Sequence, residues 1–124
     1  MISVDAWLVI DAVLDNTISD IIQSGESDEE NVVDHAQQLR QRGWDANAAH
    51  PLRGHGPVGW PPRDATLDLT LSESDLAFIH AQIDKSIRLT RIILDSERLT
   101  EVVRVEQLKS LAGLEAAAKT MSQR

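Results

Sequence analysis

Residues 50–64, with the sequence HPLRGHGPVGWPPRD, concentrate the side chains that could do chemistry. The stretch holds all four prolines, three of the six glycines, two of the four histidines and one of the three tryptophans. Its glycines, Gly54, Gly56 and Gly59, have the spacing of a dinucleotide-binding turn. Such a turn must follow a strand and open a helix, so that backbone N–H groups face the pyrophosphate. Here Trp60 is followed by two prolines, which have no N–H to offer a phosphate. We therefore interpret the glycines as residues that let a tight loop turn.

The best small-ligand hypothesis uses the two arginines of this loop. Arg53 and Arg63 could make forked contacts to a phosphate or carboxylate, and loop N–H groups would add to them. The alternative site, for a small anionic ligand or a nucleotide, consists of His50, Arg53, His55, Trp60 and Arg63. The interpretation that we prefer is structural: Trp44 and Trp60 hold the loop on the core, and the arginines pair with acids of the N-terminal third.

Neither a metal site nor a catalytic site is expected from the remaining polar residues. Zinc needs three or four converging ligands, and the four histidines have no cysteine to join them. Asp34 and His35 are neighbours on a predicted helix, where they diverge by about 100° and form no catalytic pair. No nucleophile elbow is present. We therefore expect no metal, no cofactor and no enzymatic activity.

The net charge of −8 is concentrated in the first third of the chain. Residues 1–43 carry nine acids against two bases, residues 44–65 are neutral, and residues 66–124 carry nine acids against eight bases. A protein that binds nucleic acid directly normally has a basic patch, and the sequence has no such run. Five of the acids crowd the predicted start of the second helix: Glu26, Asp28, Glu29, Glu30 and Asp34.

These five residues, called the acidic cluster below, have two interpretations. Acids are favourable near the positive end of the helix dipole, and the cluster is then a solvated face. A negative surface also speeds association with a positive partner and selects among partners. On this basis we predict a non-catalytic interaction protein that binds and regulates or inhibits a basic protein partner, such as a nucleic-acid-binding protein. Binding of a small anion by the loop is the alternative function.

The elements that must position these residues are mostly helical. We predict an α+β fold, mostly α, as a single globular domain over residues 1–124. Apolar residues at intervals of three or four predict the helices, and a leucine at every second position predicts the strand. The predicted helices are 4–23, 28–42, 73–94 and 97–119, with one short strand at 66–71 and a long Pro/Gly-rich loop at 44–65.

Local signals mark most of the predicted helix ends. Ser3 or Asp5 can cap the start of the first helix, and Gly25 can end it. Gly43 is well placed to end the second helix. Capping boxes, in which two side chains satisfy two free backbone N–H groups, are predicted to open the second and third helices: Ser27 with Glu30, and Ser72 with Asp75.

The last two predicted helices allow two arrangements. A hairpin that turns near residues 95–98 is favoured over one continuous helix of about 45 residues, which would be near 70 Å long and would need a partner chain. The fourth helix continues the helical periodicity with one apolar line, formed by Leu99, Val102, Val105, Leu108 and Ala112 and widened by Leu111 and Leu114.

The single predicted strand needs a partner, because unpaired backbone groups are costly when they are buried. The partner is either a segment of this chain, with residues 2–10 and the loop as candidates, or the same strand of a second copy. The apolar stripes of the last two helices also exceed what one hairpin can cover. Both observations predict a homodimer.

Composition indicates where the protein works. The absence of cysteine fits a reducing cytosol, and no basic residue precedes the first apolar run, which argues against a signal peptide. The longest apolar run, residues 6–10, is far shorter than the ~20 residues that span a bilayer. We therefore expect a cytoplasmic protein without membrane association.

Overall fold

The computed structural model describes residues 2–25, 30–95 and 100–122. Within these residues the chain forms four α-helices, one short 3-10 turn and one two-stranded antiparallel sheet. The elements in chain order are β1 (Ile2–Ser3), α1 (Val4–Ser24), α2 (Glu30–Ala49), η2 (Pro57–Gly59), β2 (Thr66–Leu67), α3 (Glu73–Leu94) and α4 (Glu101–Ser122). The prediction of a mostly helical α+β fold is confirmed.

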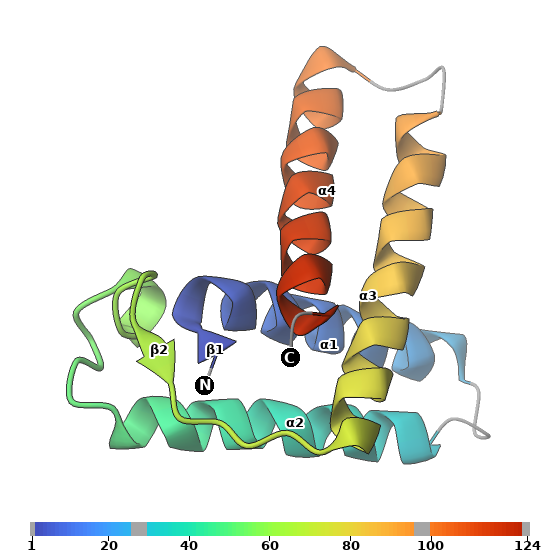
Figure 1. The fold of residues 1–124 in the computed structure, drawn as a ribbon. Helices are drawn as coiled ribbons and strands as arrows, with labels where there is room; N and C mark the ends of the chain where they lie inside the picture. The colour runs from blue at the N-terminus through green and yellow to red at the C-terminus, as the bar shows by residue number, and fades with distance from the viewer. Residues whose placement is uncertain (1, 26–29, 96–99, 123–124) are drawn as a thin grey trace.

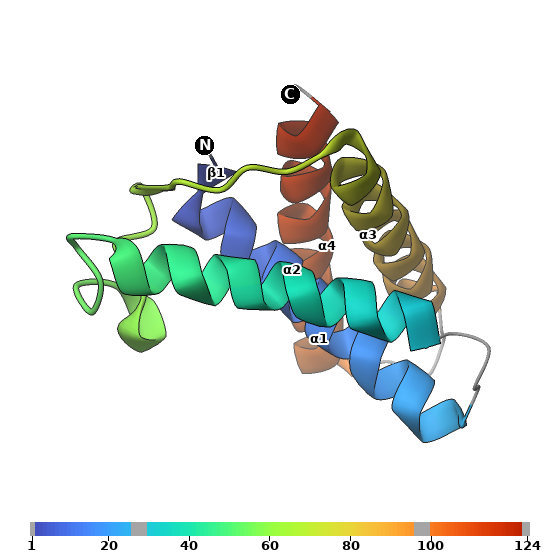
Figure 2. The same ribbon diagram turned by 90° about the horizontal axis from the view of Figure 1, so that it is seen from below.

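The helices form two parts, which we call the base and the hairpin. Helices α1 and α2 pack against each other as the base, with the small sheet at one end (Figure 1). Helices α3 and α4 pack side by side, and they project from the base as an upright hairpin (Figure 1). In the view from below, α2 lies in front and crosses α1, and the two hairpin helices stand behind them (Figure 2). The hairpin is thus confirmed over one continuous helix, although residues 96–98 of the predicted turn lie outside the described residues.

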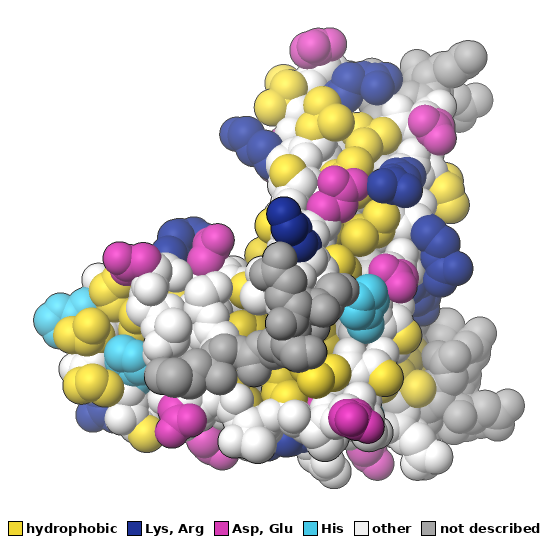
Figure 3. Space-filling model, viewed as in Figure 1, with side chains coloured by type: hydrophobic (Ala, Val, Ile, Leu, Met, Phe, Trp, Pro, Cys, Tyr) yellow, Lys and Arg dark blue, Asp and Glu magenta, His cyan; other side chains and the backbone are white. Residues whose placement is uncertain are grey.

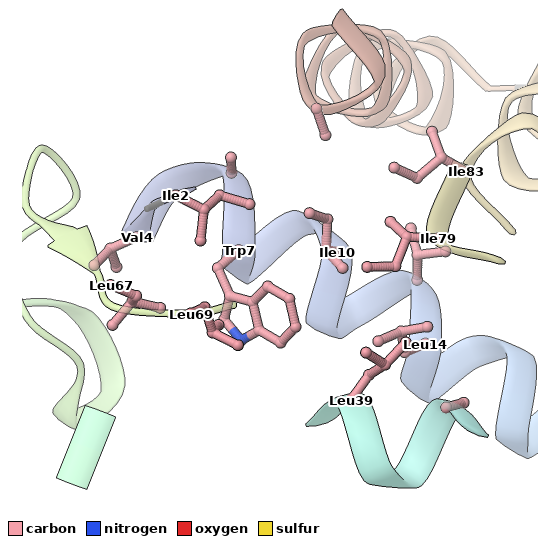
Figure 4. Close-up of a cluster of buried hydrophobic side chains, with 14 of the residues drawn as sticks. Ile2, Val4, Trp7, Ile10, Leu14, Leu39, Leu67, Leu69, Ile79 and Ile83 are labelled. Atoms are coloured by element: carbon pink, nitrogen blue, oxygen red, sulfur yellow. The ribbon is translucent and has the colours of Figure 1, made fainter. Parts of the chain in front are cut away.

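Helix α1 is the centre of the core. The Ser3 hydroxyl accepts a hydrogen bond from the Ala6 N–H at 3.1 Å and caps the helix start, and Gly25 ends the helix in a left-handed conformation with φ of 69°. Its apolar face meets side chains from the sheet, α2 and α3 (Figure 4). Figure 4 shows Trp7, Ile10 and Leu14 pointing from α1 into this cluster, and its labelled neighbours are Ile2, Val4, Leu39, Leu67, Leu69, Ile79 and Ile83.

The predicted end of the second helix at residue 42 is wrong, because α2 continues to Ala49. Gly43 lies inside the helix, where a Cβ would stand only 2.2 Å from the Trp7 indole nitrogen. The glycine therefore serves the close approach of a large aromatic ring and does not end the helix. The predicted loop shortens accordingly from 44–65 to 50–65. The capping box of Ser27 and Glu30 lies outside the described residues.

The prediction of one strand at 66–71 is also wrong. Only Thr66 and Leu67 pair, and their partner is β1 of the same chain, with Ile2 opposite Leu67. The N–H of Val4 extends the contact by donating to the carbonyl of residue 65 at 2.9 Å. Because this strand finds its partner among the N-terminal candidates, it gives no reason to expect a second copy. The alternation itself holds, since Leu67 and Leu69 are buried.

The hairpin begins as predicted and continues further. Ser72 and Asp75 form the complete capping box at the start of α3. Helix α4 begins at Glu101 and runs to Ser122, and the predicted start at residues 97–99 is outside the described part of the chain. Leu114 and Ala117 of α4 join the same core as the base, so the foot of the hairpin is fixed to α1.

Candidate interaction surfaces

Part of the acidic cluster can be placed on the base. Glu30 is the first residue of α2, and Asp34, one turn further, is exposed. Glu26, Asp28 and Glu29 lie outside the described residues. The structure adds Asp20, which is exposed on the last turns of α1, at the same end of the base as the start of α2 (Figures 1 and 2). Residues 20–34 contain six acids and no lysine, arginine or histidine.

The other acids of α1 are paired with arginines. Arg40 of α2 donates to Asp11 and to Asp15 of α1, each at 3.0 Å. The hydrogen bond to Asp11 raises the pKa of the Arg40 guanidinium, against a smaller opposing effect of burial. Arg63 donates to Asp5 at 2.9 Å. The base therefore has an arginine-paired end near the sheet and middle of α1, and an acid-rich end at residues 20–34.

A polar junction that the sequence did not reveal joins α2 to the start of α3. The Asp75 carboxylate contacts His35 Nε2 at 2.9 Å and Arg42 NH1 at 3.0 Å. It also accepts the Ser72 N–H at 3.0 Å, and the His35 ring lies on Phe78 with centroids 4.1 Å apart. His35 and Arg42 are seven residues apart, two turns along one helix face, and this spacing is the signal that could have suggested a shared partner.

Two opposing effects set the charge of this junction. Burial by itself raises the pKa of the Asp75 carboxyl, because a charged group loses hydration. Hydrogen bonds from Arg42, His35 and Ser72 together outweigh it, and they hold the pKa of Asp75 well below its usual value of 3.8. Asp75 is therefore a carboxylate at neutral pH. It has a structural role as the ionic link between two helices.

The five residues of the alternative ligand site are spread over different contacts. His50 Nδ1 accepts the Leu52 N–H, so its Nε2–H donates to the carbonyl of Thr66 at 3.0 Å. Arg53 donates to the carbonyl of Ala48 at 2.7 Å. Trp60 is buried, and Arg63 holds Asp5 as described; His55 is exposed.

The loop glycines also serve the loop itself. Gly54 donates its N–H to Gly59, and Gly56 donates its N–H to Trp60, so both amides are used within the turn. Gly54 and Gly59 have φ near +83°, and a Cβ on Gly56 would strike the Pro61 carbonyl at 2.1 Å. Trp60 in turn lies on Trp44, with ring centroids 4.6 Å apart. The geometry agrees with the structural interpretation of this segment for the two tryptophans and for Arg63. Arg53 was also expected to pair with an acid of the N-terminal third, and this is wrong, because it donates to the Ala48 carbonyl.

A groove of about 360 Å³ lies where α1, α3 and α4 meet. Its apolar lining comes mainly from α1, and Ser86, Ser110, Lys109 and Arg63 add polar groups. Arg63 also pairs with Asp5 at 2.9 Å. The groove brings none of the other four loop candidates together.

The outer half of the hairpin exposes a large apolar surface. The apolar line of α4 is largely uncovered in one chain: Val102, Val105 and Leu108 are 73 %, 45 % and 51 % exposed, and Ala112 is exposed as well. Leu99 of that line lies outside the described residues. Apolar side chains are visible over the upper hairpin, with charged groups of both signs between them (Figure 3). The remaining exposed large hydrophobic residues of the hairpin are Leu89, Ile92, Ile93 and Val103.

Neither the described residues nor comparisons with known proteins assign an identity to these surfaces. Among the residues that the structure describes, no group of three or more metal-ligating side chains converges, and no helix is both long and apolar enough to cross a bilayer. No protein-family model, no curated protein and no solved structure matches the chain.

Proposed function

We propose that this protein is a non-catalytic interaction protein whose acid-rich end, residues 20–34, binds a basic protein partner. The observation that carries the proposal is the separation of charge on the base. Arg40 and Arg63 are held by Asp5, Asp11 and Asp15, whereas no cation occurs within the acid-rich end.

This separation suits recognition of a basic surface. Exposed Asp20 and Asp34 flank the connection between α1 and α2, and the segment carries four more acids by sequence. Like charges gathered without counter-charges raise the negative potential, which attracts a positive partner and accelerates encounter. The proposal includes regulation or inhibition of that partner, because a bound acidic face occupies its basic surface.

The first step of the test is to capture the partner. A tagged chain is incubated with an extract of the source cells, the bound proteins are identified by mass spectrometry, and the partner is purified. Association and dissociation rates are then measured by surface plasmon resonance at several salt concentrations. Affinity should fall as the Debye length shortens from about 10 Å at 0.1 M salt to about 3 Å at 1 M.

The second step compares two variants with the same change in net charge. Reversal of Glu29, Glu30 and Asp34 to lysine should slow association more than it speeds dissociation, because charges at the rim of an interface act mainly on encounter. The matched control reverses three exposed acids elsewhere: Asp68, Asp84 and Asp95. A partner whose affinity ignores salt and responds equally to both variants would contradict the proposal.

A further inference from the structure

Helix α4 has two apolar faces, and one of them is uncovered. Leu114 and Ala117, near its foot, are buried against the core of the base. Val102, Val105 and Leu108 follow a spacing of three and are all exposed. Residues at this spacing share one side of a helix, so they form a strip on the outer half of α4.

The uncovered strip is large enough to matter for association. The three side chains of the strip present on the order of a few hundred Å² of apolar surface, the lower end of the range in which exposed patches mark interaction sites. A contact between two identical strips counts this area twice, and the polar side chains beside the strips add the rest of the ~1,000 Å² of a specific interface. A second copy of the chain therefore supplies a partner of the right size and chemistry.

The charges around the strip are placed so that two antiparallel copies of α4 would bring opposite charges together. Glu101 and Lys109 stand four residues before and after Val105, and Val102 and Leu108 stand three residues before and after it. In two antiparallel helices related by a two-fold axis at Val105, residues at equal distances on opposite sides of Val105 lie level with each other. Glu101 then lies level with Lys109 of the second copy, and Val102 lies level with its Leu108.

We propose that the protein forms a homodimer in which the outer face of α4 packs antiparallel against α4 of a second copy, with the two-fold axis at Val105. The overall charge favours this arrangement. Residues 85–109 carry six bases and four acids, whereas residues 1–43 carry a net charge of −7. In antiparallel packing the two hairpins, which are the least acidic parts of the chains, meet each other. The acidic α1–α2 parts of the two copies then lie at opposite ends of the dimer. The proposal does not depend on the basic partner, because it uses a different surface.

Cysteine cross-linking tests the position of the axis directly, because the natural chain contains no cysteine. Val105→Cys should form a disulfide-linked dimer under mild oxidation, since a residue on a two-fold axis meets its own copy. Ala77→Cys, on an exposed position of α3 near the base, is the matched control and should form no disulfide-linked dimer. Equal cross-linking of the two variants, or none in Val105→Cys, would overturn the axis.

Charge exchange tests the register. Glu101→Lys and Lys109→Glu each place like charges opposite each other twice, and each should raise the dissociation constant by about tenfold, as measured by analytical ultracentrifugation. An equimolar mixture of the two single variants should recover the dimer, because every contact then joins opposite charges. The double variant Glu101→Lys/Lys109→Glu should recover it as well.

The mass in solution decides the proposal as a whole. The wild type should have twice the mass of the 13.7 kDa chain at micromolar concentration, and Val105→Glu should have the mass of one chain. Circular dichroism checks that Val105→Glu is folded, as expected for a position that is 45 % exposed. A wild type that stays at 13.7 kDa up to ~100 μM, or a dimer that survives Val105→Glu, would overturn the proposal.

Discussion

Two glycines inside helices show how single residues decide the packing of this fold. Alanine normally stabilises a helix interior relative to glycine by about 1 kcal/mol. At Gly43 the added methyl group would overlap the Trp7 indole at 2.2–2.5 Å. At Gly113 of α4 the nearest atom, a methyl of Val9, would be 3.7 Å away, which is ordinary contact. Glycine-to-alanine substitution should therefore lower the free energy of unfolding at one position and raise it at the other.

We expect Gly43→Ala to lower the free energy of unfolding by about 1–3 kcal/mol, the usual cost of overpacking a core. Gly113→Ala should raise it by about 1 kcal/mol, because only the helix propensity changes there. Urea unfolding followed by circular dichroism measures both. A stabilised Gly43→Ala variant would show that Trp7 does not pack against the helix as described.

Trp60 anchors the loop, and the expected cost of removing it is large. It is 3 % exposed, so Trp60→Ala should lower the free energy of unfolding by roughly 3 kcal/mol or more, as a large core truncation does. Trp44 covers it from outside and is 42 % exposed, so Trp44→Ala should cost clearly less. Thermal unfolding of the two variants provides the comparison, and equal losses would contradict the burial of Trp60.

At the scale of elements, one carboxylate links α2 to α3 and makes stability depend on pH. The pKa of Asp75 in the folded chain lies below its unfolded value of 3.8. Its contribution to stability is therefore complete well above pH 4 and is lost as the pH falls through and below that value. Asp75→Asn should lower the free energy of unfolding by about 2 kcal/mol at pH 7, because hydrogen bonds to a charged group are lost.

The difference between wild type and Asp75→Asn should shrink between pH 5 and pH 3, because Asp75 of the unfolded chain binds a proton in this range while the folded carboxylate, with its lower pKa, stays charged. Urea unfolding at a series of pH values measures it. The control is Asp68→Asn, at an exposed position between Leu67 and Leu69, which should differ little from wild type throughout. A constant difference over this range would mean that the charge of Asp75 does not hold the two helices together.

Elements whose ends depend on neighbouring residues could be predicted from the sequence. Helix α3 begins and ends where Ser72, Asp75 and the apolar spacing place it, and Gly25 ends α1 as expected. The prediction of where α2 ends failed because Gly43 looks like a helix-ending glycine. The residue must be glycine because the Trp7 ring, 36 residues earlier in the chain, packs against it. The predicted strand was too long, because alternation continues to Leu71 whereas its partner β1 provides only Ile2 and Ser3 for pairing.

At the scale of the whole molecule, the mostly helical class and the hairpin of the last two helices could be predicted from the sequence, but the way in which the hairpin projects from the base could not. An apolar line predicts that a helix face is covered without saying by what. Periodicity marked Val102, Val105 and Leu108 as one apolar line, and the structure leaves this line uncovered in one chain. The cluster of acids could be recognised from the sequence. The junction at Asp75 could not, because it forms only where α2 and α3 pack together.

The three tryptophans all lie in the base and its loop, and the chain has no tyrosine. Trp7 is enclosed by the core beside Gly43, while Trp44 and Trp60 pack against each other at a tilt. Intrinsic fluorescence and the near-ultraviolet signal of these rings thus report on one half of the molecule, and the peptide signal of the far ultraviolet reports on every helix. The protein consequently carries a natural optical label that separates melting of the base from fraying of the hairpin, with no dye or added chromophore.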